Sequence, residues 1–233
     1  DLLSRIYREG RCPLRYRYQI SFDSPEDLRN FVESGGYKRD LGADSNKIAF
    51  GPIKLFKDGS LGGRTGTMRH EYLDDPGNYG VETTTDAEMD AFCKLADQYG
   101  LQVVTHVIGD KAIEDVTGNY ERVLHEGKNP LRHALVHCQI TDRRLLERIV
   151  KADIPVMYQP IFLDYDIHMV KDRVGEELAA SSYSWKTLKA LGTTVSNGSD
   201  CPVELPNVMG GIQCAVTRQD LKGSNPYLPQ EAF

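Results

Sequence analysis

Four short apolar segments of this 233-residue chain each carry a metal-binding or basic side chain at or near their C-terminal end. The segments and their side chains are 53–58 with Lys54, 103–106 with His106, 134–137 with His137, and 193–200 with Asp200. In a barrel of parallel strands all C-terminal ends meet at one mouth, where such folds carry their active sites. The four side chains are distant in sequence but are therefore predicted to converge at one site.

Predicted strands alternate with predicted helices along the chain. Apolar runs bounded by turn residues predict strands over residues 14–20, 53–56, 101–106, 134–137, 154–158 and 193–196. The intervening segments carry helix-start signals: Ser24 before Pro25, the pair Thr85 and Glu88 in capping-box spacing, and Thr141 as a cap. Strands separated by helices favour a parallel sheet with the helices outside it.

We expect an α/β fold of the (β/α)8 TIM-barrel type, incomplete, with about six βα units in one domain over residues 1–233. An open, doubly wound sheet is the alternative, but the Gly-x-Gly-x-x-Gly turn typical of that fold does not occur here. Two strands are then missing from the N-terminal side. The chain begins with Asp1 rather than Met, and residues 2–10 resemble the last turns of a helix, so we expect a fragment of a longer protein.

Composition excludes several classes of partner. A net charge of −6 argues against binding to a nucleic-acid backbone, because few cations would be available to displace its counterions. No apolar run approaches the roughly 18 residues that cross a bilayer, so no membrane partner is expected. Five cysteines, none in a Cys-x-x-Cys pair, favour reduced thiols in a cytoplasmic protein.

The segment 57–81, which follows the second predicted strand, is long and rich in glycine. Loops of this length in compact domains are usually either functional or disordered. The sequence leaves both interpretations open.

Two histidines are candidate metal ligands. His106 ends a predicted strand, where neutral imidazole suits zinc, iron or nickel. Taken alone, a hydrogen-bonded structural histidine is the more common interpretation of such a residue. His137 ends the next strand, and His133 precedes it by four residues. On a strand these two lie about 13 Å apart, so both cannot bind one ion. His137 is then the ligand candidate, and His133 is interpreted as structural.

Asp200 and Lys54 also have alternative interpretations. A carboxylate after Gly198 can bind metal, take a proton from bound water, or cap the following turn. A lysine within an apolar strand is costly unless it is paired or chemically altered. Lys54 could form a Schiff base, carry a carbamate that bridges two metals, or pair with Asp58 or Asp200.

The chain resembles the metal-dependent amidohydrolases, in particular the amidohydrolase 3 (YtcJ-like) branch. The resemblance covers about residues 50 to 206 and rests on the order of Lys, His, His and Asp together with five sequence blocks. These blocks are 54–62 (KLFKDGSLG), 106–112 (HVIGDKA), 137–139 (HCQ), 159–160 (QP) and 198–203 (GSDCPV). The combination is specific, although no single block is.

This resemblance implies a barrel with a divalent metal centre, usually one or two zinc ions. The implied ligands are Lys54 (in carboxylated form), His106, His137 and Asp200, with Asp200 also shuttling the proton. Arg64 and Gln159 are implied to lie near the substrate.

The sequence departs from the family pattern at two places. The His-x-His motif of the first strand is absent, which fits a chain that starts after the second strand. The acid that often precedes the sixth-strand histidine is replaced by Val136.

The function that the resemblance implies is hydrolysis of a non-peptide, amide-type C–N bond in a small-molecule substrate. The alternative is a non-catalytic binding or regulatory protein on a degenerate barrel, which the Val136 departure favours. A Schiff-base aldolase using Lys54 is the third candidate, but it leaves His106, His137 and Asp200 unexplained. Missing strands leave sheet edges unpaired, so we also expect a homo-oligomer.

Overall fold

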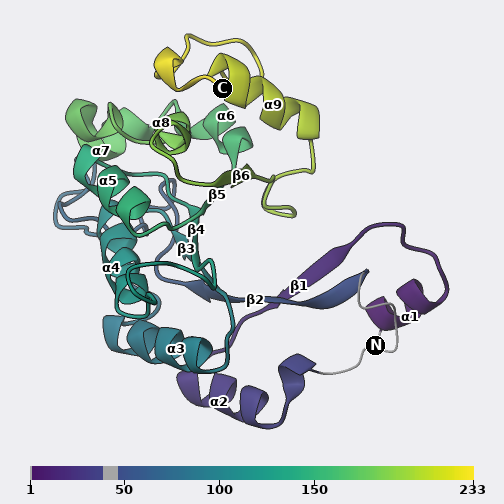
Figure 1. The fold of residues 1–233 in the computed structure, drawn as a ribbon. Coiled ribbons are helices and arrows are strands. Elements are labelled where there is room, and N and C mark those ends of the chain that lie inside the picture. Colours follow the sequence, from purple (N-terminus) through teal and green to yellow (C-terminus); the bar gives the residue numbers. More distant parts are fainter. Residues whose placement is uncertain (1, 39–46) are drawn as a thin grey trace.

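The computed structural model describes residues 2–38 and 47–233, and its strands form a half-barrel (Figure 1). The strands are β1 (Tyr16–Ile20), β2 (Ile48–Phe56), β3 (Val103–Val107), β4 (Ala134–His137), β5 (Val156–Tyr158) and β6 (Val195–Asn197). They follow one another in chain order across one six-stranded sheet, and each neighbouring pair is parallel. The predicted α/β architecture with six βα-type units is confirmed.

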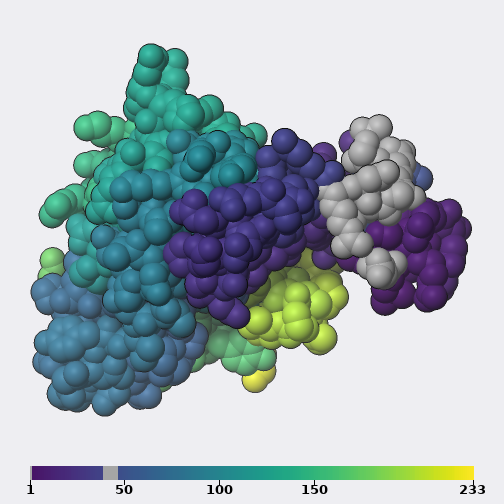
Figure 2. Space-filling model, turned by 90° about the horizontal axis from the view of Figure 1, so that it is seen from below, coloured from purple at the N-terminus to yellow at the C-terminus, as the bar shows by residue number. Residues whose placement is uncertain are grey.

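Helices cover the convex side of the sheet. The helices are α1 (Leu2–Arg8), α2 (Pro25–Glu33), α3 (Asp86–Gln98), α4 (Asp110–Glu121), α5 (Arg143–Lys151), α6 (Leu163–Asp166), α7 (Val170–Ala179), α8 (Trp185–Ala190) and α9 (Val208–Thr217). The described residues also form three 3₁₀ turns: η1 (Gly36–Lys38), η2 (Pro160–Phe162) and η3 (Pro229–Glu231). Helices α2 to α5 pack side by side along the strands, whereas α1 lies apart at one end of the molecule (Figures 1 and 2).

Two of the predicted helix starts are confirmed and one is wrong. The Ser24 side chain accepts the Asp27 N–H at the start of α2, and Thr85 and Glu88 form a full capping box on α3. The cap of α5 is Asp142, which accepts the Leu145 N–H at 2.8 Å. The neighbouring Thr141 hydroxyl instead donates to a carbonyl on the segment after α7.

The two faces of the sheet bury different side chains, because successive residues of a strand point to opposite sides. Val103 and Val107 belong to the large core beneath the helices. Between them on the strand, Val104 joins Ala134 and Val136 in a small cluster separate from that core, which we assign to the concave face. Val136, which stands where the resembled sequence pattern often has an acid, is therefore part of the barrel interior.

The glycine-rich segment 57–81 is ordered. The Tyr72 hydroxyl donates to the Gly66 carbonyl at 2.8 Å, and Asp74 pairs with both Arg64 and Arg173. Of the two interpretations left open by the sequence, disorder is excluded.

Helices α6, α7 and α9 were not predicted. Helix α6 has only four residues, and α7 is interrupted at Gly175, whose φ of +83° breaks the helical period. Within the described residues no helix combines the length and apolar character needed to span a membrane. All five cysteines are free thiols.

Candidate active site

The four side chains singled out by the sequence line one cavity of about 660 Å³ at the C-terminal edge of the sheet. Lys54 comes from β2, His106 from β3, His137 from the end of β4, and Asp200 from the turn after β6. The cavity therefore has the position that active sites take in βα barrels.

The two histidines are adjacent and uncharged. The ring centroids of His106 and His137 lie 4.4 Å apart in an edge-to-face arrangement. Burial lowers the pKa of His106 to about 4 and that of His137 well below its ordinary value, and Lys54 lowers both further. Neutral imidazole is the form that binds metal ions.

The free nitrogens of the two rings suit a ligand. Nε2 of His106 lies 2.8 Å from the Gly59 carbonyl oxygen. Because that oxygen can only accept, the proton of the neutral ring is on Nε2 and the lone pair is on Nδ1. Nδ1 of His137 is buried and has no hydrogen-bond partner among the described residues. Nε2 of the structural His133 is likewise buried without a partner, and the Gln159 side chain lies beside the His137 ring.

The backbone at the end of β4 is strained in a way that positions His137. His137 and Cys138 have φ values of 72° and 53°, in the left-handed region that non-glycine residues seldom adopt. The Trp185 indole N–H holds this turn by donating to the carbonyls of His137 at 3.1 Å and Cys138 at 3.3 Å. Asp200, with φ of 59°, is strained in the same way. Strain of this kind concentrates at functional sites.

Lys54 is an isolated cation within the described part of the chain. Burial lowers the pKa of its amine to about 8, an effect that the charge of Asp200 partly offsets. Its Nζ lies 4.4 Å from the centroid of the Phe56 ring and forms no ion pair with Asp58 or Asp200. Among the described residues no salt bridge supports the paired-lysine interpretation, although the charge of Asp200 acts on the amine. A considerable fraction of the amine is unprotonated near pH 8.

The Asp200 carboxylate faces the cavity. One carboxylate oxygen lies 3.9 Å from Nε2 of His137, and the side chain is 37% exposed. Burial raises its pKa, and Lys54 opposes that rise. The Val203 N–H is bound by the Asp200 backbone carbonyl at 2.8 Å rather than by the carboxylate, so the side chain does not cap this turn.

Arg64 and Gln159, which the resemblance places near the substrate, are not among the residues that line the cavity. Arg64 makes two hydrogen bonds to Asp74, at 3.1 and 3.0 Å, which hold its guanidinium against the loop. Gln159 is buried and donates to the Met157 carbonyl at 3.2 Å. Its side chain lies close enough to His137 to influence that ring's pKa.

His133 is structural, as its spacing from His137 indicated. Its Nδ1 accepts the Val103 N–H at 3.0 Å, which links β4 to the start of β3. The ring stacks on Tyr120, with centroids 5.2 Å apart. Burial lowers its pKa to about 4.

Sequence reasoning missed the role of Asp58. This buried carboxylate accepts three backbone N–H groups, from Thr67 at 2.9 Å, Ile108 at 3.0 Å and Gly109 at 2.8 Å. Its Oδ1 is 3.6 Å from Nε2 of His106, and burial raises its pKa to about 7. Asp58 thus joins the loop after β2 to the turn after β3. Its position just after an apolar strand, within the block 54–62, was its signal in the sequence.

The donor types at the mouth fit a divalent metal, but the described residues do not complete a site. Two neutral imidazoles, a carboxylate and a lysine able to be carboxylated are suitable ligands. Within residues 2–38 and 47–233, however, no three His, Cys, Asp or Glu side chains are grouped closely enough to hold an ion. A zinc site needs at least three protein ligands, so further donors or a carboxylated Lys54 are required.

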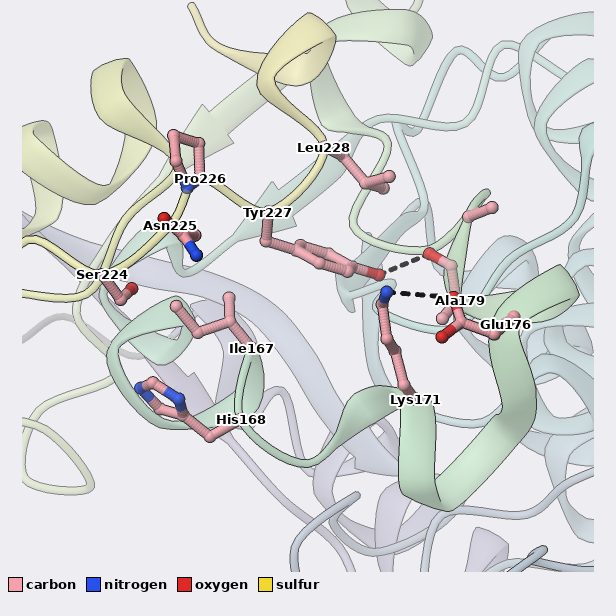
Figure 3. Close-up of a pocket in the computed structure, with 11 residues that line it drawn as sticks. Ile167, His168, Lys171, Glu176, Ala179, Ser224, Asn225, Pro226, Tyr227 and Leu228 are labelled. Carbon is pink, nitrogen blue, oxygen red and sulfur yellow. Dashed lines mark hydrogen bonds and ion pairs between the residues drawn. The ribbon is translucent and has the colours of Figure 1, made fainter.

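A second cavity, of about 430 Å³, lies between α7 and the segment 224–228 (Figure 3). Its polar groups pair with one another: Lys171 with Glu176 at 2.9 Å, and the Tyr227 hydroxyl with the Ala179 carbonyl. His168 lies 2.9 Å from Asp220. With these groups already paired, the cavity is a weaker candidate for a reactive site.

Comparison with sequence families and known relatives gives a consistent result. The model of the amidohydrolase family matches residues 1–232. YtcJ of Bacillus subtilis (strain 168), whose name describes it as an amidohydrolase, is 36% identical over 178 residues. That match covers 76% of this chain and 33% of YtcJ, so the chain spans about a third of this relative.

Two solved structures share the fold over nearly the whole chain. One is an uncharacterised metal-dependent hydrolase from Pyrococcus furiosus, with a TM-score of 0.82 and 29% identity. The other, also described as an uncharacterised metal-dependent hydrolase, comes from Pyrococcus horikoshii OT3, with a TM-score of 0.84 and 28% identity. Each match covers 99% of this chain and 45% of the other.

Proposed function

The chain belongs to the amidohydrolase family, and from that premise we propose that the protein is a metal-dependent hydrolase of non-peptide C–N bonds. The observation that carries this proposal is the meeting of Lys54, His106, His137 and Asp200 in one cavity at the barrel mouth. Because the chain spans about a third of YtcJ, the activity is proposed for the full natural protein.

In this proposal the metal is zinc, one or two ions per chain, held by His106, His137, Asp200 and a carboxylated Lys54. Bound zinc acts as a Lewis acid and lowers the pKa of bound water from 15.7 towards about 7. The lowered pKa of Lys54 supports the carbamate, because only the unprotonated amine reacts with carbon dioxide.

Asp200 is the proposed proton shuttle. Water adds to the carbonyl carbon, the C–N bond breaks, and the products are an acid and an amine. Asp200 takes the proton from the attacking water and passes it to the departing nitrogen. Its partly exposed carboxylate beside Nε2 of His137 has access both to the cavity and to the cluster of histidines.

The substrate is a small molecule, and formamides, acyl amines, cyclic amides and esters all suit the mechanism. A panel of these compounds, incubated with the full natural protein, tests the proposal. We expect hydrolysis, seen as a new amine group from each amide and an alcohol from each ester, that stops after chelation and returns on adding zinc. Turnover that is insensitive to chelation would contradict the metal-dependent mechanism.

The second candidate function is a binding or regulatory protein on a degenerate barrel. The absence of a complete three-donor cluster within the described residues favours it, as does Val136 in the barrel interior. This candidate predicts specific ligand binding without turnover and without zinc, even after reconstitution. Homo-oligomerisation and a cytoplasmic location accompany both proposals.

A further inference from the structure

The wall of the active-site cavity formed by α6 carries a carboxylate that the proposed mechanism does not use. Asp166, the last residue of α6, accepts hydrogen bonds at Oδ2 from the Tyr183 hydroxyl at 2.9 Å and from Gln139 Nε2 at 3.1 Å. Its Oδ1 has no partner among the described residues, and Asp166 lines the cavity. The side chain is thus fixed on one oxygen and open on the other.

The charges around the cavity are mainly negative. Asp166, Asp200 and Glu204 contribute carboxylates, and among the described residues that line the cavity Lys54 is the one lysine or arginine. Burial raises the pKa of Asp166 to about 6, and the nearby charge of Glu204 raises it further. With the histidines uncharged, a cationic group would be attracted to this wall.

Apolar side chains make up much of the remaining lining. They include Leu61, Phe162, Tyr165, Met169 and Val203. Tyr165 is 58% exposed and adjoins Asp166, so its ring is available for a cation–π contact. The Phe162 ring stacks on His137 at 5.6 Å between centroids, and Asp166 follows Phe162 by one helical turn. The acidic wall and the histidines are therefore connected by a short apolar surface.

The open oxygen of Asp166 and the histidines share one space. Asp166, His106 and His137 all line the cavity of about 660 Å³, and Oδ1 of Asp166 has no partner among the described residues. The cavity thus has two neutral imidazole rings at the mouth of the barrel and an open carboxylate oxygen on the wall formed by α6.

We propose that Asp166 binds a cationic group of the substrate, so that the amide cleaved at the histidines carries an ammonium or guanidinium group on an apolar stem. The proposal rests on the proposed hydrolase function and adds the substrate class to it. Asp166 acts here as a specificity-determining residue, with Tyr183 and Gln139 holding it in place. The amide carbonyl lies at the histidine end and the cation at the α6 end.

The test measures the binding of three simple probes to the metal-free chain by isothermal titration calorimetry. 2-Phenylethylamine is cationic, 2-phenylethanol is its neutral counterpart, and phenylacetate is anionic. We expect the amine to bind at least tenfold more tightly than the alcohol, and phenylacetate to bind most weakly. Equal affinity for the amine and the alcohol would overturn the proposal, and this comparison needs no variant to fold.

Substitutions in the chain show where the ammonium group of the amine binds. Asp166→Asn should reduce the affinity for the amine to that for the alcohol, whereas Asp172→Asn, the same change at an exposed site on α7, should leave the preference intact. Tyr183→Phe removes one hydrogen bond to Asp166 but leaves its carboxylate, so most of the preference for the amine should remain. A merely structural role for Asp166 would not explain that result. If the preference is lost in Asp200→Asn but persists in Asp166→Asn, the cation binds at the mouth and the proposal is wrong.

The proposed hydrolase function and the proposed role of Asp166 can be contradicted separately. A charge preference that depends on Asp166, in a protein without zinc or amide turnover, would leave the binding role standing and remove the hydrolase. Zinc-dependent turnover without a charge preference would leave the hydrolase standing and remove the role of Asp166.

Discussion

Lys54 shows how a single residue can oppose the stability of its own fold. Burial lowers the pKa of its amine to about 8, from 10.5 in the unfolded chain, so folding at neutral pH buries an ammonium ion. A shift of this size corresponds to a cost of roughly 3 kcal/mol below pH 8, which disappears as the pH rises towards 10.5.

Replacing this lysine should therefore stabilise the chain. We expect Lys54→Met to raise the free energy of unfolding at pH 7 by about 1–3 kcal/mol, with an advantage that shrinks between pH 8 and 10.5. Urea unfolding at pH 7 and pH 10 measures both effects, with the surface change Lys151→Met as a control. A variant less stable than the parent at pH 7 would show that the ammonium is well solvated.

At Asp200 we expect the opposite of the effect at Lys54: a substitution should remove function with little loss of structure. Asp200→Asn removes the proton acceptor, so turnover of the full natural protein should fall about 10²- to 10⁴-fold while its zinc content is largely kept. Steady-state kinetics and metal analysis of the same preparation check this. Near-normal turnover would exclude Asp200 as the proton shuttle.

At the scale of single residues, the sequence predicted the four side chains at the mouth of the barrel but not the carboxylates of Asp58 and Asp166. Lys54, His106, His137 and Asp200 could be found because the C-terminal ends of parallel strands meet. Asp58 and Asp166 could not, because their roles depend on contacts across the fold: with backbone N–H groups for Asp58, and with Tyr183 and Gln139 for Asp166.

At the scale of elements, His133 couples strand pairing to pH. It accepts the Val103 N–H only while neutral, and burial lowers its pKa to about 4 from 6.5 in the unfolded chain. As the pH falls, His133 binds a proton in the unfolded chain before it does so in the folded chain. The contribution of neutral His133 to stability is therefore lost as the pH falls from 6.5 towards 4.

We expect the stability difference between the parent chain and His133→Gln to shrink by about 3 kcal/mol over that range. Urea unfolding at pH 7 and pH 4.5 measures the change. His125→Gln, at an exposed histidine, provides the matched control. A difference that does not depend on pH would mean that His133 is not a buried neutral acceptor.

The strands and their main helices were predictable because each has a strong local pattern. Apolar runs mark the strands, and the side chains of Ser24 and Thr85 mark helix starts that tertiary structure did not change. The cap of α5 was misplaced by one residue, because Thr141 and Asp142 are both good caps and only the fold engages Thr141 elsewhere. Short or interrupted helices such as α6 and α7 have too little periodicity to predict.

At the scale of the molecule, the half-barrel leaves surfaces that a closed barrel would cover. Among the described residues β1 and β6 each pair on one side only. Near β6, exposed apolar side chains continue from the site turn into α9: Leu205 is 78% exposed and Met209 is 72% exposed. Unpaired edges and apolar patches of this kind promote association.

We therefore expect the 233-residue chain to form dimers or larger oligomers at micromolar concentration. Size-exclusion chromatography with light scattering measures the mass. Leu205→Lys combined with Met209→Lys should weaken the association, whereas Leu73→Lys, on the ordered loop, should not. A monodisperse monomer at every concentration would contradict this expectation.

The metal content of the full natural protein tests the central claim most directly. Inductively coupled plasma mass spectrometry should find one or two zinc ions per chain in the parent protein, and almost none in a His106→Ala, His137→Ala double variant. A parent protein without metal, even after reconstitution with zinc, would contradict the hydrolase and favour a binding protein built on a degenerate barrel.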